Sequence, residues 1–235
     1  MNNISNMVYP GRVIVIGQSP AGNAVVMYAI TGRSPSSQAR RLEIDEDQSR
    51  IFVKPTDEET LKTGNPDLLV YPAIICGDGI AVSNGKQTED VFAALSASAD
   101  PVALLLKSQQ VWEYEPDEPN YTPRISGCIA DGAGLSVLKR AADGTVMRYF
   151  FKIPMSAGSA KMVATYTGVN HNPLPSFYGE PLDVSVPWET ADEAVEAFYD
   201  ALGPAAGEPD FRVTAAVVYR DAAGSLNMRV KNRHS

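Results

Sequence analysis

Residues 12–31 decide the fold, and they read Arg12-Val-Ile-Val-Ile-Gly17, Gln18-Ser-Pro-Ala-Gly22 and Asn23-Ala-Val-Val-Met-Tyr-Ala-Ile-Thr31. Its first and last parts are rich in β-branched and apolar residues, which favour strands. The middle part holds the Ser, Pro and Gly that are typical of turns. Residues 12–31 are therefore predicted to form a β-hairpin.

Outward from this hairpin, the same pattern recurs along the chain. Asp78-Gly79 and Asp143-Gly144 predict tight turns between neighbouring strands. Further strands are predicted at residues 50–54, 68–76, 80–83, 124–130, 135–140, 146–153, 161–167, 211–219 and 225–231.

Helical spacing of apolar residues predicts helices at residues 88–98, 101–112 and 190–202. Pro101 suits a first helical position, and Thr190 with Glu193 forms a capping-box pattern. Residues 113–120 are predicted to be a polar loop, and residues 168–187, with four prolines, a long irregular segment. Many antiparallel strands with one helical region mid-chain and one late predict an α+β fold, with a single domain over residues 1–235.

Composition excludes several classes of protein. The 235 residues are 44% hydrophobic and 20% charged, which excludes a disordered chain, a collagen-like fibre and a coiled coil. The formal net charge of −8 argues against a general nucleic-acid binder, but local basic residues can still bind a small anionic substrate. Residues 1–12 lack the features of a signal peptide, and no apolar run reaches membrane-spanning length. We expect a cytoplasmic protein with no membrane partner.

The metal-binding and nucleophilic residue types are scarce. Cys76 and Cys128 lie far apart, without zinc spacing, and are predicted to be buried thiols. With only His171 and His234 in the chain, a His-rich metal site is excluded. Neither a phosphate-loop signature nor a GxGxxG after a strand is present, which argues against the common nucleotide-triphosphate and dinucleotide folds.

Three polar clusters lie at the boundaries of predicted elements, and each has a structural and a functional interpretation. Gly32-Arg33-Ser34 ends a strand in an arginine that either lies on the surface or binds a phosphate. Residues 82–88, Val-Ser-Asn-Gly-Lys-Gln-Thr, are a turn and helix cap or an anion-binding helix start. Residues 112–125 interleave Trp and Tyr with acids, as a solvated loop or as the wall of a pocket.

Together with Tyr9-x-Gly11-Arg12, these three clusters resemble the motifs of the archaeal-type IMP cyclohydrolase family. The matching motifs are Gly32-Arg33-Ser34, Val82-Ser-Asn84-Gly85-x-Gln-Thr88, Tyr114-Glu115-x-Asp117 and Tyr121-Thr-Pro-Arg124-Ile, in the family's order. The resemblance covers residues 9–130 well and weakens beyond Arg140. It implies a four-layer αββα fold of two stacked antiparallel sheets flanked by helices, similar to N-terminal-nucleophile hydrolases without their self-processing.

The implied reaction closes the six-membered ring of 5-formamidoimidazole-4-carboxamide ribotide, giving IMP and water. The small ribonucleotide is the implied partner, without nucleic acid, metal or cofactor, in a homo-oligomer. By motif, the family's catalytic residues carry over to Arg33, Glu115 and, by strand position alone, Tyr71. Glu115 would accept a proton from the carboxamide or orient it, Tyr71 would donate to the formyl oxygen, and Arg33 would stabilise that oxygen or the phosphate. The residues expected to bind substrate are Arg12, Asn84, Gly85, Tyr121 and Arg124.

Two other functions stay open. An amide or formamide hydrolase on the same fold needs a nucleophile such as Cys76 or Ser83 beside a base. A noncatalytic protein that binds purine ribonucleotides would keep the arginines without the geometry around Glu115. Residues 164–177 are longer and more polar than the family pattern, and they predict a lid or an oligomer contact that contains His171.

Overall fold

The predicted hairpin opens the first of two antiparallel sheets. A computed structural model describes residues 1–57, 70–204 and 206–234. Strand β1 (Arg12–Gln18) pairs with β2 (Ala24–Thr31) in an unbroken register from Arg12 opposite Ile30 to Gln18 opposite Ala24. Nearly every residue of both strands is buried, because this hairpin lies at the centre of its sheet.

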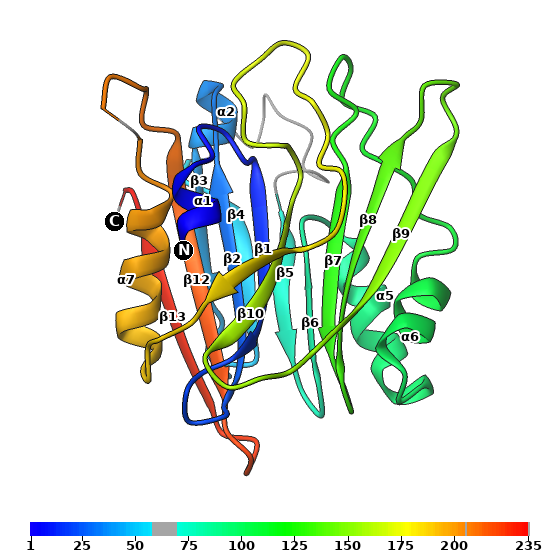
Figure 1. Ribbon diagram of the computed structural model, residues 1–235, viewed down its shortest axis with the longest axis vertical. Helices are drawn as coiled ribbons and strands as arrows, with labels where there is room; N and C mark the ends of the chain where they lie inside the picture. The colour runs from blue at the N-terminus through cyan, green and yellow to red at the C-terminus, as the bar shows by residue number, and fades with distance from the viewer. Residues whose placement is uncertain (58–69, 205, 235) are drawn as a thin grey trace.

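In the described part of the chain, the two sheets contain six and seven strands. Figure 1 shows how the strands and helices are arranged. Beside β1 and β2, the first sheet holds β10 (Ser159–Ala164), β11 (Leu182–Ser185), β12 (Arg212–Arg220) and β13 (Leu226–Asn232), in the order β11-β10-β1-β2-β12-β13. The second sheet runs in chain order through β3 (Arg40–Ile44), β4 (Arg50–Pro55), β5 (Tyr71–Cys76), β6 (Ile80–Ser83), β7 (Arg124–Ile129), β8 (Ala133–Arg140) and β9 (Val146–Ile153).

The inner faces of the two sheets share one hydrophobic core. A single cluster of buried side chains includes Ile14 and Ile16 from β1 as well as Ile74, Val82 and Leu135 from the second sheet. Because side chains alternate between the faces of a strand, the other residues of these strands point outward, toward helices. A smaller cluster, which contains Val91, Leu105 and Cys128, fills that outer space on the second sheet.

The helices form the outer layers. Helix α7 (Ala191–Ala201) packs on β12 and β13, and its N-cap Thr190 accepts a hydrogen bond from the backbone N–H of Glu193. Helices α5 (Gln87–Ala94) and α6 (Pro101–Ser108) cover the second sheet, with Pro101 in the first turn as predicted. The short helices are α1 (Asn2–Ser5), α2 (Pro35–Gln38) and the 3₁₀ turn η1 (Leu95–Ala97). The α+β class and the αββα layering are confirmed.

Some predicted bounds are wrong. Strands β3 and β11 were not predicted, since β3 is masked by the charges of Arg-Arg-Leu-Glu-Ile and β11 lies inside the segment expected to be irregular. The strand predicted at 161–167 ends at Ala164, and the helix predicted at 101–112 ends at Ser108. The helix predicted at 88–98 gives way to the 3₁₀ turn after Ala94. Residues 68–69 of one predicted strand lie outside the described residues.

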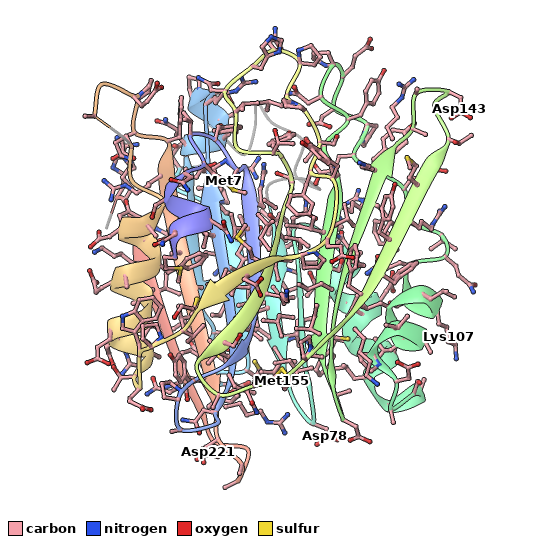
Figure 2. All side chains as sticks on the ribbon, viewed as in Figure 1. Met7, Asp78, Lys107, Asp143, Met155 and Asp221 are labelled. Carbon is pink, nitrogen blue, oxygen red and sulfur yellow. The ribbon has the colours of Figure 1, made fainter. Side chains whose placement is uncertain are left out.

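The sheets have two distinct ends. The turns that contain Asp78 and Asp221 lie at one end, and the β8–β9 turn with Asp143 lies at the other, as Figure 2 shows. Strands β1, β3, β5 and β7 begin at the Asp143 end, whereas β2, β6 and β10 finish there. Among the described residues, no helix is long and apolar enough to cross a membrane.

Candidate active site

A cavity of about 330 Å³ opens at the Asp143 end, where strands of both sheets begin or finish. Arg12 is the first residue of β1 and Arg40 the first of β3, while Arg33 follows β2 and Glu115 precedes β7. These four residues line the cavity together with Tyr9, Asp117, Thr122 and Tyr166, among others. Residues far apart in the sequence meet here because antiparallel strands bring their ends together.

Glu115 is the acidic group of the cavity floor. Its side chain is buried, and its Oε1 accepts a hydrogen bond from Asn84 Nδ2 at 3.4 Å and lies 4.0 Å from Arg124 Nη1. Burial raises the pKa of Glu115, while the positive charge of Arg12 acts in the opposite direction. A buried carboxylate with a raised pKa and room for a ligand beside it is suited to accept a proton.

Two buried arginines share this floor. Arg12 and Arg40 are each 8% exposed, and within the described chain no hydrogen-bond partner meets Arg12 Nε or the Nε and Nη1 atoms of Arg40. Burial opposes the charge on Arg12, but Tyr71 and Glu115 leave its pKa raised. Burial and the neighbouring Arg12 lower the pKa of Arg40. Buried N–H groups without acceptors are costly, so the three guanidinium N–H groups that have no acceptor among the described residues are suited to an anionic or carbonyl-bearing ligand.

Arg33 lies at the rim, between the cavity and the polar loop of residues 168–181, which precedes β11. Its guanidinium stacks over the Tyr9 ring, 5.2 Å from the centroid. Its Nη1 donates to Oδ1 of Asn170 at 3.0 Å and to the carbonyl oxygen of His171 at 2.8 Å. Leu174 of the same loop lines the cavity. The loop therefore forms part of the cavity wall, and Arg33 holds it there.

One wall of the cavity consists of two stacked aromatic rings and a chain of hydrogen bonds. Tyr9 stacks on Tyr166 with ring centroids 5.8 Å apart. The Tyr166 hydroxyl lies 2.6 Å from Thr122 Oγ1, and the Thr122 hydroxyl donates to Asp117. Asp117 also accepts the backbone N–H of Thr122 at 2.6 Å. An ionised carboxylate only accepts, so Tyr166 donates to Thr122, and Asp117 thereby fixes the loop that carries Glu115.

A second layer of residues supports Glu115 from behind. Asn84 Oδ1 accepts from the backbone N–H of Ile125 at 2.9 Å, and its Nδ2 donates to the Pro123 carbonyl at 2.9 Å. Arg124 donates to Gln87 at 3.0 Å and stacks over Trp112, and burial lowers its pKa. Gly85 allows this packing, because a Cβ there would lie 2.6 Å from Arg124 Nη1. Asn84, Gly85 and Arg124 thus lie outside the cavity lining.

Tyr71 lies deeper, in the core between the sheets. It is 2% exposed and is not among the lining residues, and its hydroxyl lies 2.9 Å from that of Tyr28. It acts electrostatically on both Arg12 and Arg40, which do line the cavity. Its hydroxyl therefore lies behind the cavity lining, close enough to influence the two arginines that line the cavity.

Comparison with known proteins identifies the family of this chain. A family model described as IMP cyclohydrolase-like protein matches residues 9–224. The chain belongs to the IMP cyclohydrolase-like family.

Relatives agree with this assignment. An IMP cyclohydrolase from Methanothrix thermoacetophila is 33% identical over 171 residues, which are 71% of this chain and 78% of the relative. One from Methanopyrus kandleri is 34% identical over 125 residues, or 53% and 60% of the two chains, respectively. One from Methanococcus maripaludis strain S2 is 25% identical over 194 residues, or 82% and 88%. The match of the IMP cyclohydrolase-like family model therefore extends well past Arg140, where the motifs weaken.

Of the eight residues predicted for this family's site, the structure places Arg12, Arg33 and Glu115 on one cavity. Tyr121 lies elsewhere: its ring packs against Tyr114 and under Arg140, and it does not line the cavity. The motifs missed Arg40 and Tyr28 altogether. The predicted strands and motifs leave out residues 35–49, which include Arg40, and they include Tyr28 only as one residue of the predicted hairpin.

The nucleophiles that a hydrolase on this family's fold would need are poorly placed. Burial raises the pKa of Cys76 to about 12. Cys76 ends β5 five residues after Tyr71, about 16 Å along the strand. Ser83 Oγ is buried and, within the described residues, has no hydrogen-bond partner that could act as a base. No group of three or more His, Cys, Asp and Glu among the described residues could hold a metal ion.

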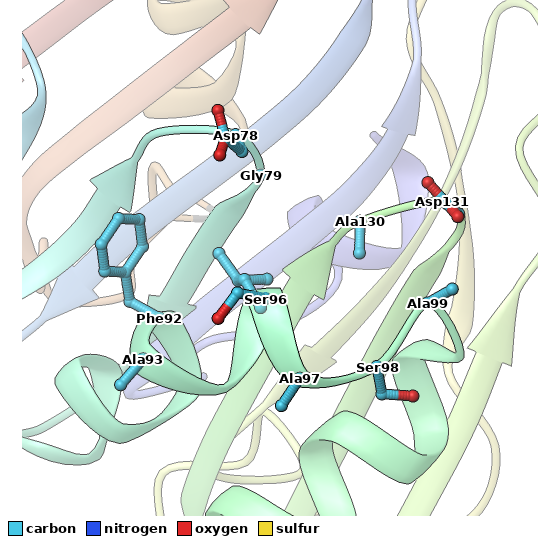
Figure 3. Close-up of a pocket in the computed structure, with 11 residues that line it drawn as sticks. Asp78, Gly79, Phe92, Ala93, Ser96, Ala97, Ser98, Ala99, Ala130 and Asp131 are labelled. Carbon is cyan, nitrogen blue, oxygen red and sulfur yellow. The ribbon is translucent and has the colours of Figure 1, made fainter.

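A larger hollow, of about 690 Å³, lies at the opposite end of the sheets (Figure 3). Asp78 and Asp131 lie at its rim, with Phe92 and small Ala and Ser side chains around it. The described residues that line it include no basic side chain, so it does not suit a ligand that carries a phosphate. We therefore assign the candidate site to the smaller, more polar cavity.

Proposed function

We propose that this protein is an IMP cyclohydrolase, which closes the purine ring of 5-formamidoimidazole-4-carboxamide ribotide to give IMP and water. Membership of the IMP cyclohydrolase-like family and relatives that bear this name support the activity. The observation that carries it is one cavity lined by a buried carboxylate, Glu115, and by two buried arginines, Arg12 and Arg40, which have N–H groups without a partner among the described residues.

The reaction needs proton transfers more than it needs a nucleophile from the protein. The carboxamide nitrogen attacks the formyl carbon, and the formyl oxygen leaves as water. One proton of that water comes from the carboxamide nitrogen and the other from the formamide nitrogen. The protein has to accept these protons, return them to the departing oxygen and hold the two groups in contact.

Glu115 is our candidate for the proton acceptor. Its carboxylate accepts only one hydrogen bond that the structure describes at its Oε1, from Asn84, which leaves capacity for a substrate N–H. In our proposal Glu115 takes the carboxamide proton as the C–N bond forms and then delivers it to the departing hydroxyl. Exclusion of water from the buried floor strengthens this interaction.

Tyr71 and the arginines are our candidates for stabilising negative charge, both the charge that develops on the formyl oxygen and the charge of the bound phosphate. Tyr71 donates to the formyl oxygen as it gains negative charge, and it later accepts the formamide proton. Arg12, Arg33 and Arg40 place three positive charges on the cavity against Glu115 and Asp117. This local surplus of positive charge suits a phosphate dianion, even though the whole chain carries a formal charge of −8.

Three coarser properties complete the proposal. We propose that residues 1–235 form a single domain, that the protein acts in the cytoplasm and that it is a homo-oligomer. The single core cluster shared by both sheets supports the first of these. Analytical ultracentrifugation of the purified chain tests the oligomer, and a monomer at micromolar concentration contradicts it.

The test is a spectrophotometric assay with the formamido ribotide, following purine absorbance with the uncatalysed rate subtracted. We expect turnover by the natural chain and its loss in Glu115→Gln and Arg33→Ala. A fall in kcat for Arg33→Ala assigns Arg33 to the formyl oxygen, and a rise in KM assigns it to the phosphate. Arg229→Ala is the matched control, since Arg229 pairs with exposed Asp192 beside α7. Absence of turnover in the natural chain contradicts the proposed function.

A further inference from the structure

Tyr28 joins the two sheets at the floor of the cavity. It lies on β2 of the first sheet, and its hydroxyl oxygen is 2.9 Å from that of Tyr71 on β5 of the second sheet. Both side chains are almost completely buried, at 0% and 2% exposure. For each hydroxyl, the other is the one hydrogen-bond partner that the described residues provide.

The position of Tyr28 follows from the strand register. Tyr28 lies opposite Ile14 of β1, two residues along from Arg12, so Tyr28 and Arg12 point to the same inner face. On its other side, β12 presents the small residue Ala216 opposite Tyr28. An aromatic side chain in the middle of an apolar strand can thus extend its polar end across the core, toward the second sheet.

The geometry allows either hydroxyl of the pair to donate to the other. Burial raises the pKa of Tyr28 well above its ordinary value, so Tyr28 keeps its proton at neutral pH. Arg12 and Arg40, which also act on Tyr28, are donors and cannot accept that proton. The Tyr71 oxygen is then the acceptor at hand, because a buried hydroxyl without an acceptor is unfavourable.

We propose that Tyr28 is a positioning residue for ring closure: its hydroxyl donates to the Tyr71 oxygen and so directs the Tyr71 proton toward the formyl oxygen of the substrate. The inference rests on the proposed function. As the C–N bond forms, the proton of Tyr71 passes to the formyl oxygen, and the carboxamide proton passes to Glu115. The Tyr71 phenolate that results accepts a stronger hydrogen bond from Tyr28, with Arg12 nearby. Tyr71 regains a proton from the formamide nitrogen as water leaves, so Tyr28 ends each cycle unchanged.

This role makes the effect of Tyr28 depend on Tyr71. A hydrogen bond that strengthens only when Tyr71 becomes charged contributes to kcat and not to substrate binding. It also disappears when Tyr71 has no hydroxyl. A residue that merely fills the core would instead change stability with no such dependence.

The experiment is a double-mutant cycle of Tyr28→Phe and Tyr71→Phe, measured as kcat and KM in the ring-closure assay. Phenylalanine keeps the ring and its packing, and thermal unfolding with IMP binding verifies that each variant is folded. Tyr219→Phe is the matched control, because Tyr219 is also buried in the first sheet and donates to the Trp188 carbonyl at 2.9 Å. We expect Tyr28→Phe to lower kcat about tenfold or more with KM nearly unchanged.

In the double variant we expect the kcat of Tyr71→Phe alone, with no additional loss. Unchanged kcat in Tyr28→Phe, or losses that multiply in the double variant, would overturn the role of Tyr28 while leaving the cyclohydrolase standing. An inactive natural chain would overturn both together, so the two failures are distinguishable. If Tyr28→Phe does not fold, Ala216→Gly, which loosens the packing beside the Tyr28 ring, is measured in both Tyr71 backgrounds with the same expected pattern.

Discussion

Asn84 donates its side-chain amide to Glu115 at 3.4 Å and, with the same group, to the Pro123 carbonyl at 2.9 Å. Its Oδ1 meanwhile accepts from the backbone of Ile125 and from Gln87. One buried amide thereby ties the Asn-Gly turn, the loop of Glu115 and the start of β7 together. The two motifs that contain Asn84 and Glu115, 31 residues apart in the sequence, are therefore in direct contact.

Replacing Asn84 by alanine should lower kcat about tenfold and destabilise the fold by about 2 kcal/mol, because Ile125 and Pro123 lose buried partners. Steady-state kinetics and urea unfolding measure the two effects. Gln109→Ala is the control, since Gln109 is equally buried but its side chain bonds, among the described residues, to Ser136 beneath α6 alone. It should lose stability and keep kcat. Equal kcat in both variants would argue against a supporting role for Asn84.

The pH dependence of kcat/KM should show an acid limb that belongs to Glu115. Burial raises the pKa of Glu115, so its protonated, inactive form persists to higher pH than in an ordinary glutamate, whose pKa is about 4.3. Activity should therefore fall as the pH drops through that raised pKa. In Glu115→Gln, the residual rate should keep only the titration of the substrate phosphate, near pH 6. An acid limb of the same position and depth in both proteins contradicts the assignment.

The substitution Arg40→Met should lower the activity and raise the stability of the protein. Burial lowers the pKa of Arg40, which means that folding works against its charged form, so an apolar side chain of similar length should raise the free energy of unfolding by about 1 kcal/mol or more. Loss of a donor at the cavity floor should lower kcat/KM about tenfold or more. Urea unfolding and the ring-closure assay check both signs. A variant that is less stable and fully active would show that Arg40 is structural.

Gly11→Ala should destabilise the entry to β1 by about 2 kcal/mol or more. Gly11 has φ +76°, and a Cβ there would lie 2.1 Å from Thr165 Oγ1, the acceptor of the Arg12 backbone N–H. Gly22→Ala separates strain from collision, because Gly22 has φ +83° with nothing within 4 Å of the added Cβ. It should cost only about 1 kcal/mol. Similar losses in the two variants would refute the steric explanation.

Neither cysteine should react in the folded protein. Burial raises the pKa of both Cys76 and Cys128 to about 12, so at pH 8 only about one thiol in ten thousand is ionised. Ellman's reagent should therefore detect two thiols in denaturant and almost none in buffer. Rapid labelling of a thiol in the native protein, with loss of activity, would instead revive a cysteine mechanism.

Local patterns predicted most of the fold. The alternation of residues 12–31 and the Asp-Gly turns give the strands and their neighbours, because hairpin pairing is a short-range property. Strand β3 was missed since Arg40, Arg41 and Glu43 gave it the appearance of a surface connection. The charges of Arg41 and Glu43 are tolerated because these half-exposed side chains lie on an edge strand, whereas Arg40 is buried at the cavity, and both positions depend on contacts distant in sequence.

The site was predictable only where chemistry and local position coincide. Arg33 and Glu115 follow or precede strands in polar motifs, and both line the cavity. Tyr28 sits in an otherwise apolar strand, and only the stacking of the second sheet shows that its hydroxyl meets Tyr71. Tyr121 belongs to a matching motif, but its backbone turns at φ 45° and its ring packs against Tyr114 instead.

The reactive groups are carried by two sheets. Apolar side chains make most of the contact between these sheets. The spacing between the two sheets therefore sets the distances of Tyr28 and Arg12, on the first sheet, from Tyr71, on the second sheet. A lineage that repacks this interior for a hotter or colder habitat has to conserve this spacing, even at positions remote from the substrate. The rim formed by the loop of residues 168–181 is under no such constraint, so differences in length among relatives should accumulate there.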